Sequence, residues 1–265
     1  MKSQSMKSQL INIIKHQDCF DFLQEVKSNS IDLILTDPPY IISKETGFKS
    51  VVKGVKRFGV SMDFGEWDKN QSNLLPLIQE FYRVLKKGGT CIIFYDIWKI
   101  SILKNFLDKN NFKQLRLIEW IKDNPVPLNS QINYLTNAKE IAISAVKGSN
   151  PVFNSSYDNG LYQYPIYHSK DRFHPTQKPL KLFEDLIKKH TNQQDTVLDC
   201  FLGSGTTAIA SLNLNRNFIG CELNQTYYNK ILNRISLYQN KKPTLKKPTL
   251  KKPTLKKPTL KKIQL

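Results

Sequence analysis

The chain has 265 residues, 40% of them hydrophobic, which is ordinary for a globular protein and is enough for one large domain with a proper core or for two small ones. Its formal net charge at pH 7 is +18; the last 25 residues hold ten lysines and no acidic residue, which leaves a body of +8. A basic body favours a polyanionic partner such as nucleic acid, with a merely well-solvated surface as the alternative.

Neither a disulfide framework nor a metal site is indicated. The sequence has no CxxC pair, and the histidines do not cluster with the four widely separated cysteines, Cys19, Cys91, Cys200 and Cys221. We therefore expect reduced core thiols in a cytoplasmic protein, and no metal. The apolar run at 10–14 is too short for a signal peptide or a membrane span, and the repeated MKSQ leaves Met6 open as a start.

Predicted strands and helices alternate along the body. In chain order, we expect strands at 31–36, 90–95, 113–120, 139–148, 195–201 and 217–223, and helices at 72–87, 96–110, 180–190, from 206, and at 224–238. Asp96 is placed to cap the second of these helices, and residues 148–173 show no clear period. The alternation predicts an α/β fold with a doubly wound, mainly parallel sheet, in which ligands bind beyond the carboxyl ends of the strands.

Residues 1–240 are expected to form a single domain, followed by a tail at 241–265. The tail repeats KKPTL, and a proline at every fifth position excludes a helix. We expect a disordered, cationic segment that adds weak, salt-sensitive affinity for nucleic acid, or an inert expansion of the repeat.

A glycine turn between a strand and a helix, in VLDCFLGSGTTAIA, predicts a cofactor site. Gly203 and Gly205 let the backbone turn sharply and approach a ligand, and Glu222 ends the next strand, where it could bind two ribose hydroxyls. The pattern also fits a dinucleotide fingerprint, so a nicotinamide-dependent oxidoreductase and a purely structural turn both stay open.

Two features of this turn favour S-adenosylmethionine over a dinucleotide. Asp199 precedes the loop, where its carboxylate would repel a pyrophosphate and could face the amino-acid end of S-adenosylmethionine. Phe201 and Leu202 separate the strand from the first glycine, which gives a looser turn than a phosphate-binding one.

The segment TDPPY ends the strand at 31–36 with an acid, two prolines and an aromatic ring. An exocyclic amino group of adenine or cytosine is a weak nucleophile, because its lone pair is conjugated with the ring. Asp37 and the carbonyl of Pro38 would accept its two hydrogens and favour a pyramidal nitrogen. Tyr40 offers a face for stacking, worth about 1–3 kcal/mol, to a base flipped out of the duplex. The segment therefore predicts methylation of a base amino group.

Further motifs stand in a fixed order around these two. HQDCFDFLQEVKSNSIDLIL precedes TDPPY; LKKGGTCIIF, EWIKDNPVP, NAKEIAISAVKG and HPTQKPLKLFEDLI follow it; and FLGSGTT comes about 160 residues after TDPPY. In this order the chain resembles, over most of residues 10–240, the β-type amino-methylating DNA methyltransferases of bacterial restriction–modification systems. The resemblance implies S-adenosylmethionine as cofactor and a circularly permuted, seven-stranded sheet with one antiparallel strand.

The resemblance also implies roles for individual residues. Asp37, Pro38, Pro39 and Tyr40 would form the catalytic segment. Asp18 would lie near the adenine of the cofactor, Thr176 and Lys178 at its carboxylate, and Glu222 at its ribose. The other residues expected to bind the cofactor are Asp37, Asp199, Phe201, Gly203, Ser204, Gly205 and Thr206.

For three of these residues a structural role is the alternative. Asp18 could be a helix N-cap, Lys178 an exposed lysine at a helix start, and Tyr40 a core residue. Gln17 stands where the family usually has glycine, which weakens the assignment of Asp18.

Aspartate at the first position of DPPY goes mostly with adenine in this family, and serine mostly with cytosine. The resemblance therefore favours adenine-specific methylation of double-stranded DNA, with cytosine-N4 or RNA methylation as alternatives. A basic loop at about 41–66 would be mobile and close on the DNA, with a merely disordered surface loop as the alternative. An insertion at about 123–173 would read the target sequence. A homodimer and a cognate restriction endonuclease acting on the same site stay open as partners, and no membrane is expected.

Overall fold

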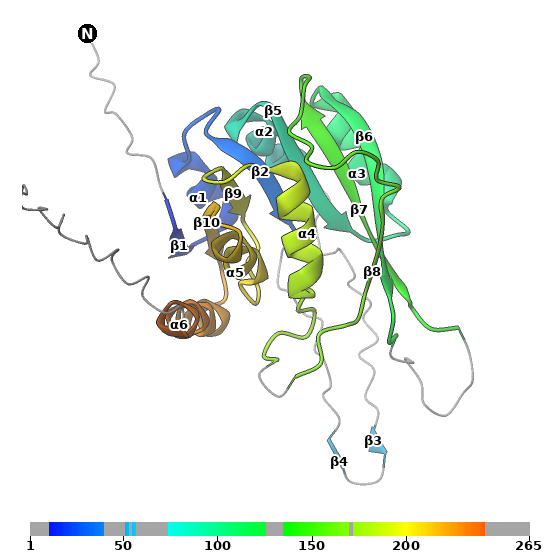
Figure 1. The fold of residues 1–265 in the computed structure, drawn as a ribbon, viewed down its shortest axis with the longest axis vertical. Coiled ribbons are helices and arrows are strands. Elements are labelled where there is room, and N and C mark those ends of the chain that lie inside the picture. The colour runs from blue at the N-terminus through cyan, green and yellow to red at the C-terminus, as the bar shows by residue number, and fades with distance from the viewer. Residues whose placement is uncertain are drawn as a thin grey trace, which may run out of the picture.

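The computed structural model describes residues 11–39, 51–52, 55–56, 74–125, 135–169 and 172–241. Its centre is an eight-stranded sheet in the order β1-β10-β9-β2-β5-β7-β6-β8, with helices on both faces (Figure 1). The strands are β1 (Ile13–His16), β2 (Ile31–Thr36), β5 (Leu85–Tyr95), β6 (Phe112–Lys122), β7 (Lys139–Lys147), β8 (Leu161–Tyr164), β9 (Thr196–Asp199) and β10 (Asn217–Glu222). The helices are α1 (Cys19–Glu25), α2 (Leu74–Val84), α3 (Ile100–Lys109), α4 (Leu180–His190), α5 (Thr206–Asn213) and α6 (Gln225–Lys241). A separate antiparallel pair joins β3 (Val51–Val52) to β4 (Val55–Lys56).

The sheet confirms the predicted mainly parallel α/β class. Among the described strands of this sheet, β7 alone runs antiparallel to its neighbours, β5 and β6. The sheet has eight strands rather than the expected seven, because β8 pairs in parallel with β6. This extra strand lies in the stretch at 148–173 that shows no clear sequence period, and its four residues are too few to reveal one.

Two predicted helices are shorter than expected, the first at its end and the second at its start. The helix predicted to run through residue 87 ends at Val84, and the chain enters β5 directly, with Gly88 at a φ of +82° inside that strand. The next helix starts at Ile100 rather than after Asp96, because Asp96 caps a preceding turn instead. Its Oδ1 accepts a hydrogen bond of 2.8 Å from the backbone N–H of Trp98.

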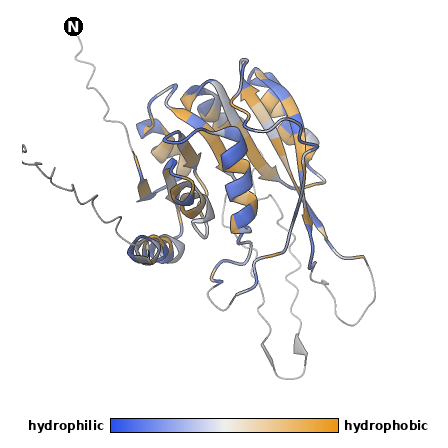
Figure 2. Cartoon of the chain, in the orientation of Figure 1, coloured by the Kyte–Doolittle hydropathy of each residue, from blue (hydrophilic) through white to orange (hydrophobic). Residues whose placement is uncertain are grey.

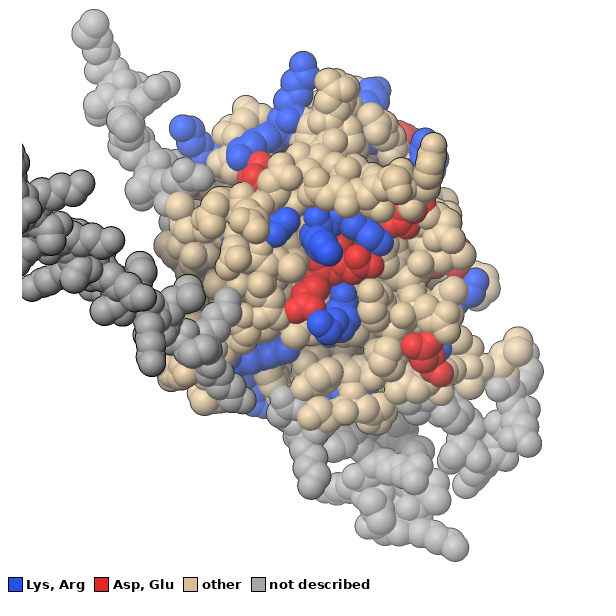
Figure 3. All heavy atoms as spheres, viewed as in Figure 1, with Lys and Arg blue, Asp and Glu red and all other residues tan. Residues whose placement is uncertain are grey.

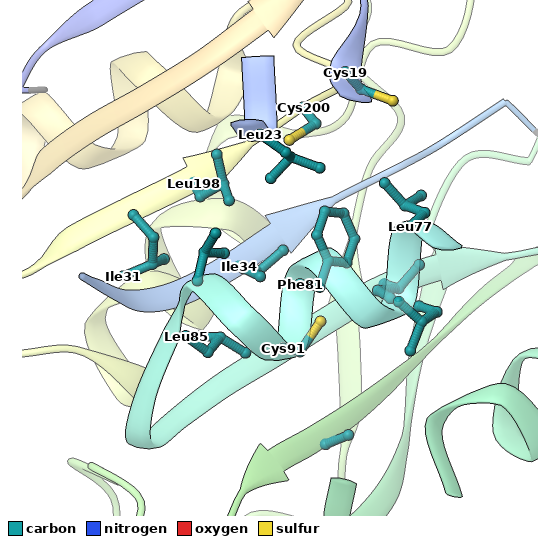
Figure 4. Packing of buried hydrophobic residues seen from close by; sticks show 14 of the residues in the cluster. Cys19, Leu23, Ile31, Ile34, Leu77, Phe81, Leu85, Cys91, Leu198 and Cys200 are labelled. Atoms are coloured by element: carbon teal, nitrogen blue, oxygen red, sulfur yellow. The ribbon is translucent and has the colours of Figure 1, made fainter. Parts of the chain in front are cut away.

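The central strands are buried on both faces, so their side chains alternate between two hydrophobic clusters. In β2, Ile34 packs into a cluster with α1, α2 and α3, whereas Leu33 and Leu35 pack beneath α4. Figure 4 shows Ile34 converging with Leu23 of α1 and Phe81 of α2. Figure 2 shows the same division along α4, whose outer surface is hydrophilic above apolar strands. This double burial explains the continuous apolar runs of the central strands.

The four cysteines are buried and unpaired, as expected for core thiols. In the part of the chain that the structure describes, no helix is both long and apolar enough to cross a bilayer.

Acidic and basic side chains mix on the face that carries α4 (Figure 3). Lys189 forms ion pairs with Asp158 at 2.8 Å and Asp185 at 3.1 Å, and Lys181 pairs with Glu184 at 3.2 Å. This face therefore presents paired charges of both signs rather than a single basic patch.

Candidate active site

Four parallel strands end side by side and bring the predicted site residues to one edge of the sheet. β2 pairs with β9, β9 with β10, and β10 with β1, where His16 lies opposite Glu222. The chain proceeds from β2 to β5 on one side and from β9 to β10 on the other. The direction of the strand order therefore reverses between β2 and β9, and open α/β sheets bind ligands beyond the strand ends at such a point. Asp37 and the glycine loop follow these two strands directly.

Asp37 is held by a buried lysine. The Nζ of Lys178 lies 2.6 Å from Oδ2 of Asp37 and 2.6 Å from Oε2 of Glu140, and Lys178 is only 6% exposed. Burial alone would lower the pKa of Lys178, but the two carboxylates hold it above its ordinary value. The interpretation of Lys178 as an exposed lysine is therefore wrong. Within the chain, its ammonium group contacts the predicted catalytic acid.

The structure describes only part of the remaining predicted catalytic segment. Pro38 is buried and Pro39 half-buried at the end of β2. Tyr40 lies outside the described residues, so its predicted stacking role stays a prediction.

Asp199 ties the end of β9 to the end of β2. Its Oδ1 accepts hydrogen bonds from the Thr36 hydroxyl at 2.7 Å and from the Phe201 N–H at 3.0 Å, and its Oδ2 accepts one from the Thr207 hydroxyl at 2.6 Å. Burial raises the pKa of Asp199 to about 6, against the opposing effect of these donors. The carboxylate thus joins the strand of Asp37 to the glycine loop.

The glycine loop needs both of its glycines. Gly203 and Gly205 have φ values of +51° and +72°, the left-handed region that residues with a Cβ rarely adopt. A Cβ on Gly205 would lie 2.8 Å from Cγ2 of Ile231, and one on Gly203 would lie 3.2 Å from Nε2 of His174. The loop is therefore packed closely between α6 and the HPTQKP segment.

Glu222 holds this loop from the neighbouring strand. Its Oε2 accepts a hydrogen bond of 2.7 Å from the Gly203 N–H, and its Oε1 accepts one of 2.8 Å from the Asn224 N–H. Burial raises the pKa of this carboxyl above its ordinary value.

Ser204 and Thr206 continue the loop into α5 as buried residues. Their hydroxyls lie 2.9 Å apart, and the Thr206 hydroxyl donates to the Lys178 carbonyl at 3.4 Å. Arg234 of α6 donates to the Ser204 carbonyl at 2.7 Å. The start of α5 is thus joined both to α6 and to the segment that supplies Lys178.

His174 is a residue that our sequence interpretation missed, although it opens the HPTQKP motif. Its ring lies 4.5 Å from that of Tyr227, edge to face, and its Nδ1 lies 3.2 Å from the Thr176 hydroxyl. Burial, with the nearby charges of Lys178 and Arg172, lowers the pKa of His174 to about 4. A neutral imidazole therefore supports Gly203 and places Thr176 beside the loop.

Asp18 caps α1, as the structural alternative predicted. Its Oδ1 accepts a hydrogen bond of 2.8 Å from the Phe20 N–H. The adjacent Gln17 donates from its amide to Glu25 at 3.1 Å. Because Asp18 follows β1, it still lies at the same edge of the sheet as Glu222.

Carboxylates dominate the edge formed by these four strand ends, at Asp18, Asp37, Asp199 and Glu222. Such a lining disfavours a pyrophosphate and suits a cationic cofactor with free ribose hydroxyls. Together with the glycine cradle between His174 and Ile231, this fits the class of S-adenosylmethionine-dependent methyltransferases.

Comparison with known proteins identifies the family. The profile of N6 and N4 amino-methylating enzymes, described as DNA methylase, matches residues 31–233, and the chain belongs to this family. It is 36% identical to the type II methyltransferase M2.MboI of Moraxella bovis, over 77% of this chain and 80% of that protein. It is 33% identical to M2.DpnII of Streptococcus pneumoniae, over 81% and 86% of the two chains.

Solved structures agree with this assignment. The protein in the crystal structure of an M1.HpyAVI–SAM complex has 34% sequence identity to this chain. The match has a TM-score of 0.63 and covers 83% of this chain and 98% of that one. The cytosine-N4-specific PvuII DNA methyltransferase, at 19% identity and a TM-score of 0.65, shares the fold.

Proposed function

We propose that this protein transfers a methyl group from S-adenosylmethionine to the exocyclic amino group of a flipped adenine in double-stranded DNA, as the modification enzyme of a restriction–modification system. The observation that carries the proposal is the position of Asp37 beside the glycine loop, at the ends of the adjacent strands β2 and β9. The adenine assignment is supported by the aspartate of DPPY. A further relative is named DNA adenine methyltransferase YhdJ of Escherichia coli, at 27% identity over 84% of this chain and 82% of that protein.

The roles of the residues follow from their chemistry. Asp37, ionised beside the ammonium group of Lys178, accepts one hydrogen of the amino group, and the Pro38 carbonyl accepts the other. These two acceptors favour the pyramidal nitrogen whose lone pair forms the new bond to carbon. The proton released from that nitrogen leaves by way of Asp37 or solvent. When bound, S-adenosylmethionine supplies the methyl group on a positively charged sulfur.

The cofactor would be held by the glycine loop and the acids around it. Phe201, Gly203, Ser204, Gly205 and Thr206 would line it, Glu222 would bind the ribose, and Asp18 would lie near the adenine. Thr176 and Lys178 would meet its carboxylate, and Asp199 would lie beneath its amino-acid end. Support for this assignment comes from the arrangement of the residues at one edge of the sheet.

Within the single domain at 1–240, we assign target reading to about 123–173 and DNA closure to about 41–66, with 241–265 as a cationic tail. β6 and β7 bracket the start of the first segment, and β8 anchors its far part to the sheet. A homodimer and a cognate endonuclease are further proposals, the second of them supported by the type II names of the relatives. The four unpaired thiols support a location in the cytoplasm.

The test is to incubate the purified protein with S-adenosylmethionine and unmethylated DNA, digest the DNA to nucleosides and weigh them. The expected product is N6-methyl-2′-deoxyadenosine. N4-methylated cytosine would overturn the base assignment and leave the mechanism in place. Methylation confined to RNA in a parallel reaction would overturn the DNA substrate, and NAD binding without methylation would overturn the function.

A further inference from the structure

Four charged side chains of alternating sign form a row that begins with Asp37, the predicted catalytic acid. Asp37 pairs with Lys178 at 2.6 Å, Lys178 with Glu140 at 2.6 Å, and Glu140 with Lys122 at 2.9 Å. The side chains of Lys122 and Glu140 are 10% and 23% exposed. The last two members have no part in the proposed chemistry, since neither reaches Asp37 except through Lys178.

The chain of charges crosses the sheet. Asp37 follows β2, Glu140 lies on β7 and Lys122 ends β6, whereas the strand between β2 and β7 is β5. Lys178 spans this gap, with its Nζ 5.1 Å from the centre of the Phe94 ring of β5. Phe94 in turn stacks on Phe183 of α4, with the two ring centres 5.8 Å apart. Lys178 thus links two strands that do not touch each other.

Such an arrangement is costly unless every charge is paired. Removing two charges from water costs several kcal/mol, which the pair recovers only with good geometry and with further partners for each group. Here each of the two inner groups has two partners of opposite sign. Apolar residues would pack the same space at no such cost, so the arrangement points to a role in orienting the acid at its end.

We propose that Glu140 is a positioning residue for methyl transfer, which fixes Lys178 and thereby the carboxylate of Asp37, and that Lys122 fixes Glu140 from the other side. This inference rests on the proposed function. With one anchor, Lys178 could rotate about its flexible stem; with two, on opposite sides of β5, its ammonium group is held in place. Asp37 then keeps the orientation that its role as an acceptor requires.

The chain offers a matched control on the same two strands. Glu119 of β6 pairs with Lys139 of β7 at 3.0 Å, but these side chains are more exposed and the pair makes no contact with Lys178. Glu119→Gln and Glu140→Gln each remove one carboxylate of an ion pair between β6 and β7. They differ in whether that carboxylate is linked to Asp37.

The experiment measures single-turnover transfer of a labelled methyl group to DNA at saturating cofactor and DNA. We expect Glu140→Gln to slow transfer roughly ten- to hundredfold, because small displacements of reacting groups have effects of that size. The KM for DNA should change less than about threefold, and the affinity for S-adenosylmethionine without DNA should fall by a smaller factor than the transfer rate, since Lys178 is also assigned to the carboxylate of the cofactor. Glu119→Gln should behave as wild type. Lys122→Met should slow transfer less than Glu140→Gln, and Lys122→Arg should restore it.

Two outcomes would overturn the inference. One is an unchanged transfer rate in Glu140→Gln; the other is a loss confined to cofactor affinity, which would mean that the pair serves the cofactor rather than Asp37. If Glu140→Gln does not fold, as thermal melting would show, Lys122→Met decides, and a wild-type rate there would overturn the inference. Failure of the proposed function is separate, because it would appear as the wrong product from the wild-type protein.

Discussion

The backbone N–H of Gly203 donates a 2.7 Å hydrogen bond to Oε2 of Glu222, so the end of β10 fixes the glycine loop that follows β9. The other oxygen, Oε1, accepts the N–H of Asn224, and the residue is only 9% exposed. Glu222 therefore fixes the shape of the glycine loop, which is the proposed cofactor site.

We expect Glu222→Ala to weaken binding of S-adenosylmethionine by about tenfold or more, because it loses two hydrogen bonds to a carboxylate together with the proposed ribose contact. Glu222→Gln should lose less, since its amide oxygen still accepts one N–H. Calorimetric titration with the cofactor measures both. Asp108→Ala, which removes an exposed acid of α3 paired only with Lys104 at 2.6 Å, is the control. An unchanged Kd in Glu222→Ala would place the ribose elsewhere.

Asp37→Ala should reduce methylation by at least about 10²- to 10³-fold, as expected when a preorganised group that stabilises the transition state is lost. Cofactor binding should be partly retained, because the glycine loop and Glu222 are untouched. Asp96→Asn is the control, since Asp96 follows the adjacent strand β5 and caps only a turn. Methyl transfer and cofactor affinity are measured on the same preparations. Full activity in Asp37→Ala would contradict the mechanism.

The sequence predicted the elements whose signals are local. Helix α4 begins and ends at the predicted residues, because Pro179 precedes it and because Leu182, Phe183, Leu186 and Ile187 recur at helical spacing and are buried. Asp37 and the glycine loop were found for a similar reason, since each is a short motif directly after an apolar strand.

The contacts of Lys178 could not be predicted in this way. Glu140 lies 38 residues before it, and what brings the two together is the position of β7 two places from β2 in the sheet. A lysine near the start of a helix is usually exposed, so the local sequence favoured an exposed side chain, whereas Lys178 is buried. β8 was missed because its evidence is also non-local: Trp120 of β6 donates its ring N–H to the Tyr164 carbonyl at 2.7 Å.

Acid should destabilise the protein through two half-buried histidines, His174 and His190. Burial lowers the pKa of His174 and of His190 from 6.5 to about 4, and the Nδ1 of His190 is buried without a hydrogen-bond partner. The unfolded chain therefore takes up these protons at higher pH than the native chain. Stability that is present above pH 6.5 is lost as the pH falls toward 4, by at most about 1.4 kcal/mol per pH unit for each histidine.

Asp199 has the opposite effect, because its pKa is raised from 3.8 to about 6. The contribution of Asp199 to the free energy of unfolding is fully present below pH 3.8 and is lost as the pH rises through 6. Urea unfolding between pH 7 and pH 4.5 should show a net loss of stability, and His190→Asn should reduce the slope. An equal slope in His190→Asn would contradict the assignment.

Lys178→Met should destabilise the fold by about 3–5 kcal/mol, the usual cost of removing one partner from a buried ion pair. Asp37 and Glu140 would then face each other without the cation that now separates them. Lys178→Arg keeps the charge and should recover most of the stability. Urea unfolding at pH 7 measures both variants. Wild-type stability in Lys178→Met would show that the ion pairs contribute nothing to folding.

Deletion of residues 242–265 should leave single-turnover methyl transfer unchanged and weaken DNA binding chiefly at low salt. The deletion removes nine lysines and no acidic residue beyond the end of α6, so it removes counterion release and none of the proposed site residues. Titration of DNA at about 50 and 200 mM salt should give a shallower dependence of log K on log salt in the truncated protein. A tail of the same length with its lysines changed to glutamine is the control and should match the deletion. A truncated protein with no transfer activity would show that the tail belongs to the catalytic domain.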